Sequence, residues 1–315
     1  MSPRIGLALG SGSARGWAHI GVLRELNEQG IKPDIVCGSS IGAVVAAAYV
    51  SNQLDEFESW IYSLNWWDIV RLMNIRLRKG GFIEGERLMA FLRKYIDEIT
   101  IEQLHLPFGA VATDLVTGRE IWLREGLLAD AVRASIALPG LFTPVKLGNR
   151  WVVDGGLVNP VPVSLCRALG ADIVIAVNLN AEIPGRHFSH PQLKMSEAKK
   201  KSIDVSLLAK LFSHTPNGIK EKANSLISQS LGFNGEGPGL FDVLTNSINI
   251  MQHQITRSRM AGDPPNVVLV PHLADVGLLE FERAKESVTE GKECVKRMLP
   301  HLEHALQIHD YKVGA

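Results

Sequence analysis

The first 50 residues contain one local pattern twice: a short apolar run, a turn of small residues, and then a helical pattern. Residues 5–9 form the first apolar run, which ends at Gly10 and is followed by helical spacing over 17–29. Residues 35–37 form the second, and an apolar helical pattern follows over 41–50. Strands that alternate with helices in this way are typical of a parallel sheet covered by helices. The pattern predicts an α/β fold.

The alternation continues to about residue 180, where the composition changes. Apolar runs predict further strands, and helical spacing predicts further helices. The strands are expected over 108–113, 120–123, 151–153, 171–179 and 266–271, and the helices over 54–98, 127–137, 163–169, 240–260 and 279–308. Residues 184–239 are polar and interrupted by Gly and Pro, which is typical of a mobile insertion or lid. We expect a catalytic core over 5–180, this insertion, and helices and a strand over 240–315 that complete the same domain.

Charge and cysteine content exclude several classes of protein. The chain has 315 residues, with 33 basic and 33 acidic side chains, so no global field favours nucleic acid. Cys37, Cys166 and Cys294 lie far apart, which indicates neither a disulfide framework nor a zinc site. The apolar run near the start of the chain is too short for a signal peptide. No stretch approaches the roughly 18 consecutive apolar residues of a membrane span. We expect a cytoplasmic protein that meets lipid, if at all, peripherally.

The second small-residue turn has the G-x-S-x-G pattern of a serine nucleophile. Its residues are Gly38, Ser39, Ser40, Ile41 and Gly42. Glycine two positions on either side of a serine allows a sharp turn between a strand and a helix, so that the hydroxyl projects at the start of the helix. The positive end of that helix favours developing negative charge. A serine that caps the helix, with glycines for close packing, is the structural alternative.

The first small-residue turn is a glycine-rich loop between a strand and a helix. It comprises Gly10, Ser11, Gly12, Ser13, Ala14, Arg15 and Gly16. Backbone N–H groups in such a loop can bind a phosphate or form an oxyanion hole, or the loop can be a structural turn. A dinucleotide site fits poorly, because Arg15 stands where the third glycine of G-x-G-x-x-G belongs. The second strand also ends at Gly38, where a ribose-binding acid is expected.

A serine nucleophile needs a base, and two residues are candidates. Asp154 ends the apolar run 151–153 and begins an Asp-Gly-Gly turn with Gly155 and Gly156. Burial beside an uncharged serine would raise the pKa of this carboxyl towards the working range of a general base. His272, which follows the last expected strand, is the candidate for a Ser–His–Asp triad. Asp-Gly turns are common, so this motif taken alone favours a β-turn without a chemical role.

Taken together, three motifs resemble those of a known family. They are residues 7–16, 38–42 and 153–162, and two further segments, 112–120 and 134–144, support them. This combination resembles the patatin-like phospholipases, and it is most similar to the bacterial RssA-type proteins and the catalytic domain of neuropathy target esterase. The resemblance runs from about Ile5 to Asn180. It implies a three-layer fold with a mainly parallel central sheet flanked by helices.

The resemblance also implies a mechanism. The family uses a Ser–Asp dyad without histidine, which corresponds to Ser40 and Asp154, and it requires no metal or cofactor. The glycine-rich loop supplies the oxyanion hole, here through N–H groups near Gly12, Ser13 and Ala14. An arginine matching Arg15 follows the loop, and serines at 11 and 13 stand where the family often has glycines. The implied activity is cleavage of lipid carboxyl esters through an acyl-enzyme.

A tryptophan pair followed by a basic segment is a candidate for lipid contact. Trp66 and Trp67 precede a segment, 71–79, in which arginine and lysine alternate with apolar residues. This arrangement indicates either an interfacial patch for anionic lipid or core packing.

The alternatives to the lipid ester hydrolase are a Ser–His–Asp esterase of the α/β-hydrolase type and a regulatory lipid-binding protein with an idle site. The first requires His272 for activity, and the second requires Ser40 to be unreactive.

Overall fold

The computed structural model describes residues 3–64, 75–78, 81–83, 89, 93, 96, 98–139, 141–182 and 240–308. The chain divides into two compact units, Met1–Glu182 with Met251–Ala315, and Ile183–Ile250. The fold below is that of the first unit. The expected insertion, 184–239, lies outside the described residues, as do Trp66 and Trp67.

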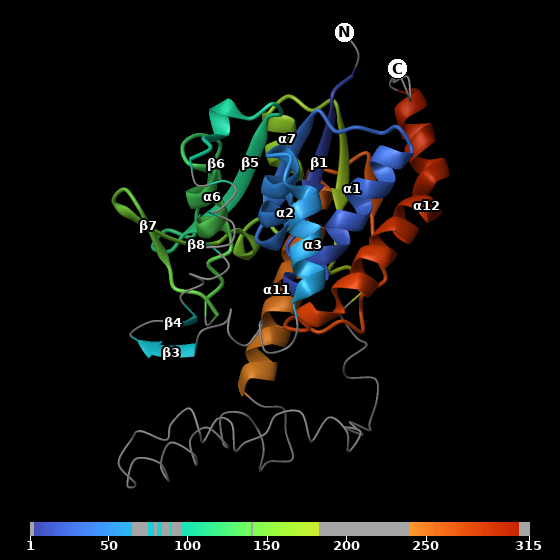
Figure 1. Cartoon of the computed structure of the whole chain (residues 1–315). Coiled ribbons are helices and arrows are strands. Elements are labelled where there is room, and N and C mark those ends of the chain that lie inside the picture. The colour runs from blue at the N-terminus through green and yellow to red at the C-terminus, as the bar shows by residue number, and fades with distance from the viewer. Residues whose placement is uncertain are drawn as a thin grey trace, which may run out of the picture. The chain divides into compact units, whose positions relative to one another are not determined.

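An eight-stranded sheet forms the centre of the first unit (Figure 1). Its strands are β1 (Ile5–Leu9), β2 (Ile35–Ser39), β5 (Phe108–Asp114), β6 (Glu120–Leu123), β7 (Val145–Leu147), β8 (Arg150–Asp154), β9 (Ile173–Val177) and β10 (Val267–Leu269). The order is β10-β9-β1-β2-β5-β8-β7, and β6 also pairs with β5. The five strands from β10 to β5 are parallel, whereas β6 and β8 run antiparallel to β5. The mainly parallel α/β fold predicted from the sequence is confirmed.

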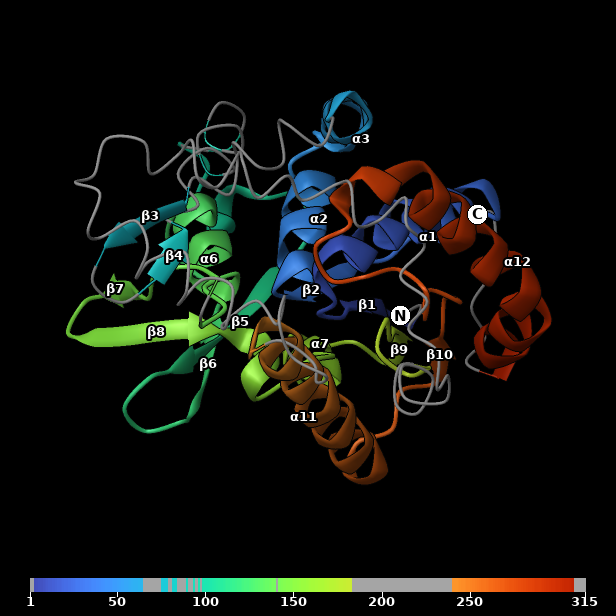
Figure 2. The ribbon, with the colours of Figure 1, turned by 90° about the horizontal axis from the view of Figure 1, so that it is seen from below.

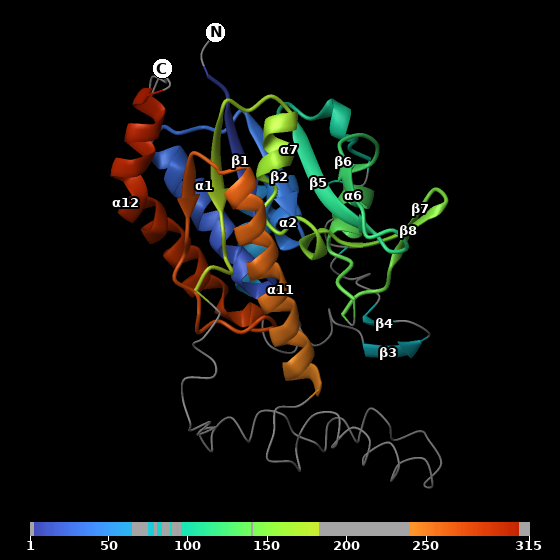
Figure 3. The same ribbon diagram turned by 180° about the vertical axis from the view of Figure 1, so that it is seen from behind.

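Helices cover both faces of this sheet (Figure 2). The helices are α1 (Ala18–Glu28), α2 (Ile41–Val50), α3 (Leu54–Ser63), α6 (Leu128–Ser135), α7 (Val163–Ala168), α11 (Leu240–Gly262) and α12 (Ala284–Ile308). On one face lie α1, α2, α6 and α12, and on the other lie α7 and the part of α11 from residue 251 on (Figure 3). All residues of β1, β2 and β9 are buried, as expected of parallel strands covered on both faces.

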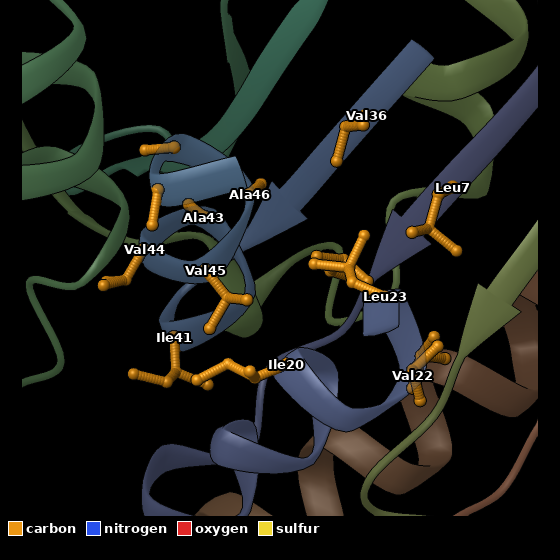
Figure 4. Close-up of a cluster of buried hydrophobic side chains, with 14 of the residues drawn as sticks. Leu7, Ile20, Val22, Leu23, Val36, Ile41, Ala43, Val44, Val45 and Ala46 are labelled. Carbon is orange, nitrogen blue, oxygen red and sulfur yellow. The ribbon is translucent and has the colours of Figure 1, made fainter. Parts of the chain in front are cut away.

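The larger core cluster lies between the sheet and the layer of α1 and α2 (Figure 4). Leu7 of β1 and Val36 of β2 contribute from the sheet, and Leu23 and Val45 contribute from the helices. Every residue of α2 except Tyr49 is buried. Such a helix, apolar on all sides, is stable only in the interior. The burial fixes the start of α2, and therefore Ser40, against the sheet.

One strand carries both halves of the candidate site. Both β6 and β8 pair with Ala112, so they lie on opposite edges of β5; both β2 and β6 pair with Val111, so they too lie on opposite edges. Consequently β2 and β8 pair with the same edge of β5. Because β2 is parallel and β8 antiparallel to β5, their carboxyl ends face each other. Ser39 ends β2 opposite Val111, and Asp154 ends β8 opposite Ala112. The ends of the two strands meet at successive positions of β5.

The sequence-based expectation of helix over 54–98 is wrong in part. Helix α3 ends at Ser63, and residues 75–78 and 81–83 form the antiparallel strands β3 (Ile75–Arg78) and β4 (Gly81–Ile83). Ile75 and Leu77 alternate with arginines, which is the two-residue period of a strand, and glycines at 80 and 81 interrupt a helix.

None of the helices in the described part of the chain is long and apolar enough to cross a bilayer.

Candidate active site

Ser40 occupies a strained turn between β2 and α2. Its backbone has φ 56° and ψ −126°, a left-handed φ that non-glycine residues rarely adopt. The flanking glycines make the turn possible: a Cβ on Gly38 would lie 2.4 Å from Cα of Ala43, and one on Gly42 would lie 2.2 Å from the carbonyl oxygen of Leu9. The Ser40 N–H donates to Oγ of Ser135 in α6 at 2.9 Å. The hydroxyl is therefore presented in one fixed direction.

The Ser40 hydroxyl points at the Asp154 carboxylate. Ser40 Oγ donates to Asp154 Oδ2 at 2.5 Å, and the N–H of Gly156 donates to Oδ1 at 2.7 Å. The peptide groups of Asp154 are also fixed, because its N–H donates to the carbonyl of Ala137 at 3.0 Å and its carbonyl accepts from Oγ1 of Thr113 at 2.7 Å. Both oxygens of the carboxylate and the backbone that carries it thus have defined partners.

Burial changes the acid–base chemistry of Asp154. The residue is 0% exposed, and loss of hydration raises the pKa of its carboxyl from 3.8 to about 7. The hydrogen bonds from Ser40 and Gly156 oppose this rise but are weaker than the desolvation. A carboxyl that titrates near neutral pH can accept a proton far more effectively than an ordinary aspartate. The arrangement is chemically suited to activate the serine.

Four N–H groups of the glycine-rich loop donate to carbonyl groups of the chain. Those of Gly10 and Ser11 donate to carbonyls of Val177 and Pro160 at 3.1 and 2.8 Å. Those of Ala14 and Arg15 donate to carbonyls of Leu278 and Gly12, at 3.1 and 3.3 Å. Within the described chain, the N–H groups of Gly12 and Ser13 donate to no acceptor.

The loop is fixed from within by Arg15 and Gly16. Arg15 is 2% exposed, its Nε donates to the carbonyl of Gly12 at 3.2 Å, and burial lowers its pKa to about 9. A Cβ on Gly16 would lie 2.3 Å from Ile41, so the loop packs directly on the first turn of α2. This contact places the glycine-rich loop beside Ser40.

Histidine 19 was not predicted from the sequence. Its Nε2 lies 2.7 Å from the carbonyl of Gly10, and burial lowers the pKa of the imidazole to about 4, more than the hydrogen bond raises it. The neutral ring therefore carries its proton on Nε2 and donates to Gly10. His19 holds the loop from the side of α1.

A buried amide network, also not predicted, holds the loop from the side of α11. Gln252 Oε1 accepts from Oγ of Ser11 at 3.1 Å and from Nδ2 of Asn180 at 2.9 Å. Asn180 Nδ2 also lies 3.2 Å from the carbonyl of Ser11, and a Cβ on Gly156 would lie 2.6 Å from Gln252 Nε2. Ser11, which stands where the family often has glycine, thus uses its hydroxyl. Helical spacing alone gave no signal for Gln252.

The structure does not bring His272 to the serine. The His272 side chain is 61% exposed, and its Nδ1 lies 3.6 Å from Oε1 of Glu182. It follows β10, which β9 and β1 separate from β2 in the sheet. Among the described residues, no group of three or more His, Cys, Asp or Glu side chains could hold a metal ion.

The chain is similar to several known proteins. A family model described as patatin-like phospholipase matches residues 7–167. An uncharacterized NTE family protein of Mycobacterium tuberculosis is 32% identical over 334 residues, which cover 96% of this chain and 93% of that protein. A patatin-like phospholipase domain-containing protein of Caenorhabditis elegans is 34% identical over 56% of this chain and 14% of its own length. Among solved structures, VipD from Legionella pneumophila aligns with a TM-score of 0.45 and 13% identity, covering 98% of this chain and 67% of that chain.

Proposed function

Because the chain belongs to the patatin-like phospholipase family, we propose that it hydrolyses carboxyl esters of lipids with Ser40 as nucleophile and Asp154 as general base. The observation that carries the proposal is the hydrogen bond from Ser40 Oγ to Asp154 Oδ2, 2.5 Å long and buried at the carboxylate. A buried carboxyl is costly unless it is hydrogen-bonded, and here the partners of Asp154 are the hydroxyl of Ser40 and the N–H of Gly156.

The reaction proceeds in two halves. In the first, Asp154 takes the proton of Ser40 while Oγ attacks the ester carbonyl carbon, and the N–H groups of Gly12 and Ser13 stabilise the oxyanion. Asp154 then gives that proton to the oxygen of the departing alcohol, which leaves an acyl group on Ser40. In the second half, water attacks the acyl group, its proton passes to Asp154 and then back to Ser40 Oγ, and the fatty acid is released.

The decisive experiment compares four proteins: wild type, Ser40→Ala, Asp154→Asn and His272→Ala. We expect Ser40→Ala to lose both ester hydrolysis and covalent labelling by a fluorophosphonate. Asp154→Asn, which keeps the shape of the side chain, should lose about 10²–10⁴-fold in hydrolysis, the usual contribution of a general base. His272→Ala should retain the wild-type rate, because its imidazole lies against Glu182.

Near-ultraviolet circular dichroism of each variant separates a chemical defect from misfolding. Hydrolysis by Ser40→Ala at the wild-type rate would refute the nucleophile. Loss of activity in a well-folded His272→Ala would instead support the Ser–His–Asp alternative. Phospholipid, lysophospholipid and simple esters assayed in parallel identify the substrate.

A further inference from the structure

The turn after β5 presents apolar side chains to solvent. Leu115 is 50% exposed and Val116 is 83% exposed. The turn is nevertheless well defined, because Asp114 Oδ1 accepts from the N–H groups of Val116 and Thr117 at 3.0 and 2.9 Å. At the end of the turn, a Cβ on Gly118 would meet nothing within 4 Å among the described residues. Exposure of the two apolar residues is therefore a fixed feature and not fraying.

A second projecting element adds a tryptophan beside this turn. Trp151 of β8 is 48% exposed, and its carbonyl accepts from the N–H of Leu115 at 2.8 Å. Trp151 pairs with Lys146 across the β7–β8 hairpin, which reaches out from the sheet (Figure 1). The three apolar residues thus lie on two adjacent projecting elements.

The surface formed by Leu115, Val116 and Trp151 is here called the tip surface, and the same two elements carry three cationic residues. Lys146, Arg119 and Arg150 are all exposed, and the Arg150 side chain is 67% exposed. The acidic group within this turn is Asp114, whose side chain is only 9% exposed and whose Oδ2 lies 4.0 Å from Arg150. The next acid, Glu120, is engaged by Arg259 at 2.7 Å. Within the described turn and the β7–β8 hairpin, the exposed charge is therefore positive.

The tip surface and the candidate site both lie at the carboxyl ends of the parallel strands. Strand β5 is parallel to β2, so the carboxyl ends of the two strands lie on the same side of the sheet. Ser39, just before the nucleophile, pairs with Val111, and Leu115 lies four positions farther along. At about 3.3 Å per residue, the tip surface extends beyond the nucleophile by about 13 Å.

We propose that the tip surface docks the protein on a membrane of anionic phospholipid. The proposal rests on the proposed function, since a hydrolase of membrane lipids reaches its substrate at such a surface. Aliphatic and tryptophan side chains enter the headgroup region, while lysine and arginine around them bind anionic headgroups.

The test measures vesicle binding by Ser40→Ala, so that hydrolysis cannot alter the membrane. Co-sedimentation uses vesicles of phosphatidylcholine with phosphatidylglycerol, and vesicles of phosphatidylcholine alone. We expect binding to the anionic vesicles, and a loss of about tenfold or more on adding Val116→Asp, Trp151→Ala, or Lys146→Glu with Arg119→Glu. Trp122→Ala is the matched control, because Trp122 is also an exposed tryptophan of this sheet, 38% exposed, but lies opposite Val111.

Each other outcome overturns the proposal. Unchanged vesicle binding by the tip variants would do so, as would equal loss in Trp122→Ala, or loss only on replacing Trp66 and Trp67. A dimer that becomes a monomer with Val116→Asp would assign the surface to a second copy. Hydrolysis of a soluble ester by the tip variants in the wild-type background reports separately on the proposed function, because it needs no membrane.

Discussion

At the scale of single residues, the site combines a strained serine with a desolvated acid. The left-handed φ of Ser40 carries an energetic cost, and the burial of α2 together with the hydrogen bond from its N–H to Ser135 offsets it. The cost at Asp154 is electrostatic, since its carboxylate has lost hydration. Backbone strain and a strongly shifted pKa are both typical of functional sites, which is consistent with the proposed roles of Ser40 and Asp154.

The first prediction at this scale concerns pH. Because the pKa of Asp154 is raised to about 7, kcat/KM for a soluble ester should increase as pH rises through about 7 and level off above it. An aspartate with its ordinary pKa of 3.8 would give a flat profile across the same range. His19, with a pKa of about 4, does not titrate there. A profile that is flat between about pH 5 and 9 would contradict the role of Asp154.

The same titration has a second readout in stability. A raised pKa means that the folded protein holds a proton at pH values where the unfolded chain has released it. The stabilising contribution of protonated Asp154 to the free energy of unfolding is fully present below about pH 3.8. It is lost as the pH rises through about 7. Asp154→Asn carries no titratable group, so its melting temperature should rise relative to wild type from pH 4 to pH 8. A constant difference across this range would show that the carboxyl titrates normally.

At the scale of elements, the site depends on how β2, β5 and β8 are paired. The strand–turn–helix order and the serine turn could be predicted from the sequence, because glycine spacing and apolar periodicity are local signals. The meeting of Ser40 and Asp154 could be expected only through the family resemblance. Its physical cause is the head-to-head arrangement of β2 and β8 on one edge of β5, which is a long-range pairing. The β3–β4 hairpin was missed because a helical pattern was extended across two glycines.

A prediction at this scale concerns the contact between α11 and the glycine-rich loop. Gln252→Ala removes the acceptor of Ser11 Oγ and Asn180 Nδ2, so it should destabilise the fold by about 1–3 kcal/mol. It should also slow fluorophosphonate labelling of Ser40, because the loop loses a partner that positions it. The measurements are urea unfolding and the labelling rate. The double variant Ser11→Ala/Gln252→Ala should lose less unfolding free energy than the sum of the two single variants, since both single variants break the same hydrogen bond.

Strict additivity of Ser11→Ala and Gln252→Ala would show that the two residues act independently. Arg259→Gln provides a matched control on the same helix. It removes an ion pair with Glu120, at 2.7 Å, without touching the loop. That variant should leave the labelling rate unchanged.

At the scale of the whole molecule, the C-terminal part of the chain completes a site whose motifs lie elsewhere. The family model ends at residue 167, yet the carbonyl of Leu278 accepts from Ala14 at 3.1 Å, and that of Phe281 accepts from Trp17 Nε1 at 3.1 Å. Helix α12 then packs along α1, the helix that follows the glycine-rich loop. No residue pattern predicts these contacts, because every residue has a backbone carbonyl group that can accept a hydrogen bond.

The closeness of α1 and α12 depends on two glycines and gives the last prediction. A Cβ on Gly291 would lie 2.1 Å from the carbonyl oxygen of Ala18, and one on Gly21 would lie 1.9 Å from that of Val288. Backbone cannot yield as a flexible side chain can, so Gly291→Ala must separate the helices, at a cost of about 1–3 kcal/mol. Gly262→Ala is the control, because a Cβ there meets nothing within 4 Å. Thermal melting should show a loss only for Gly291→Ala, and slower labelling of Ser40 should accompany it, since α12 follows the segment that holds Ala14. Equal melting temperatures for the two variants would mean that the helix pair adjusts freely and that the C-terminal helix does not brace the site.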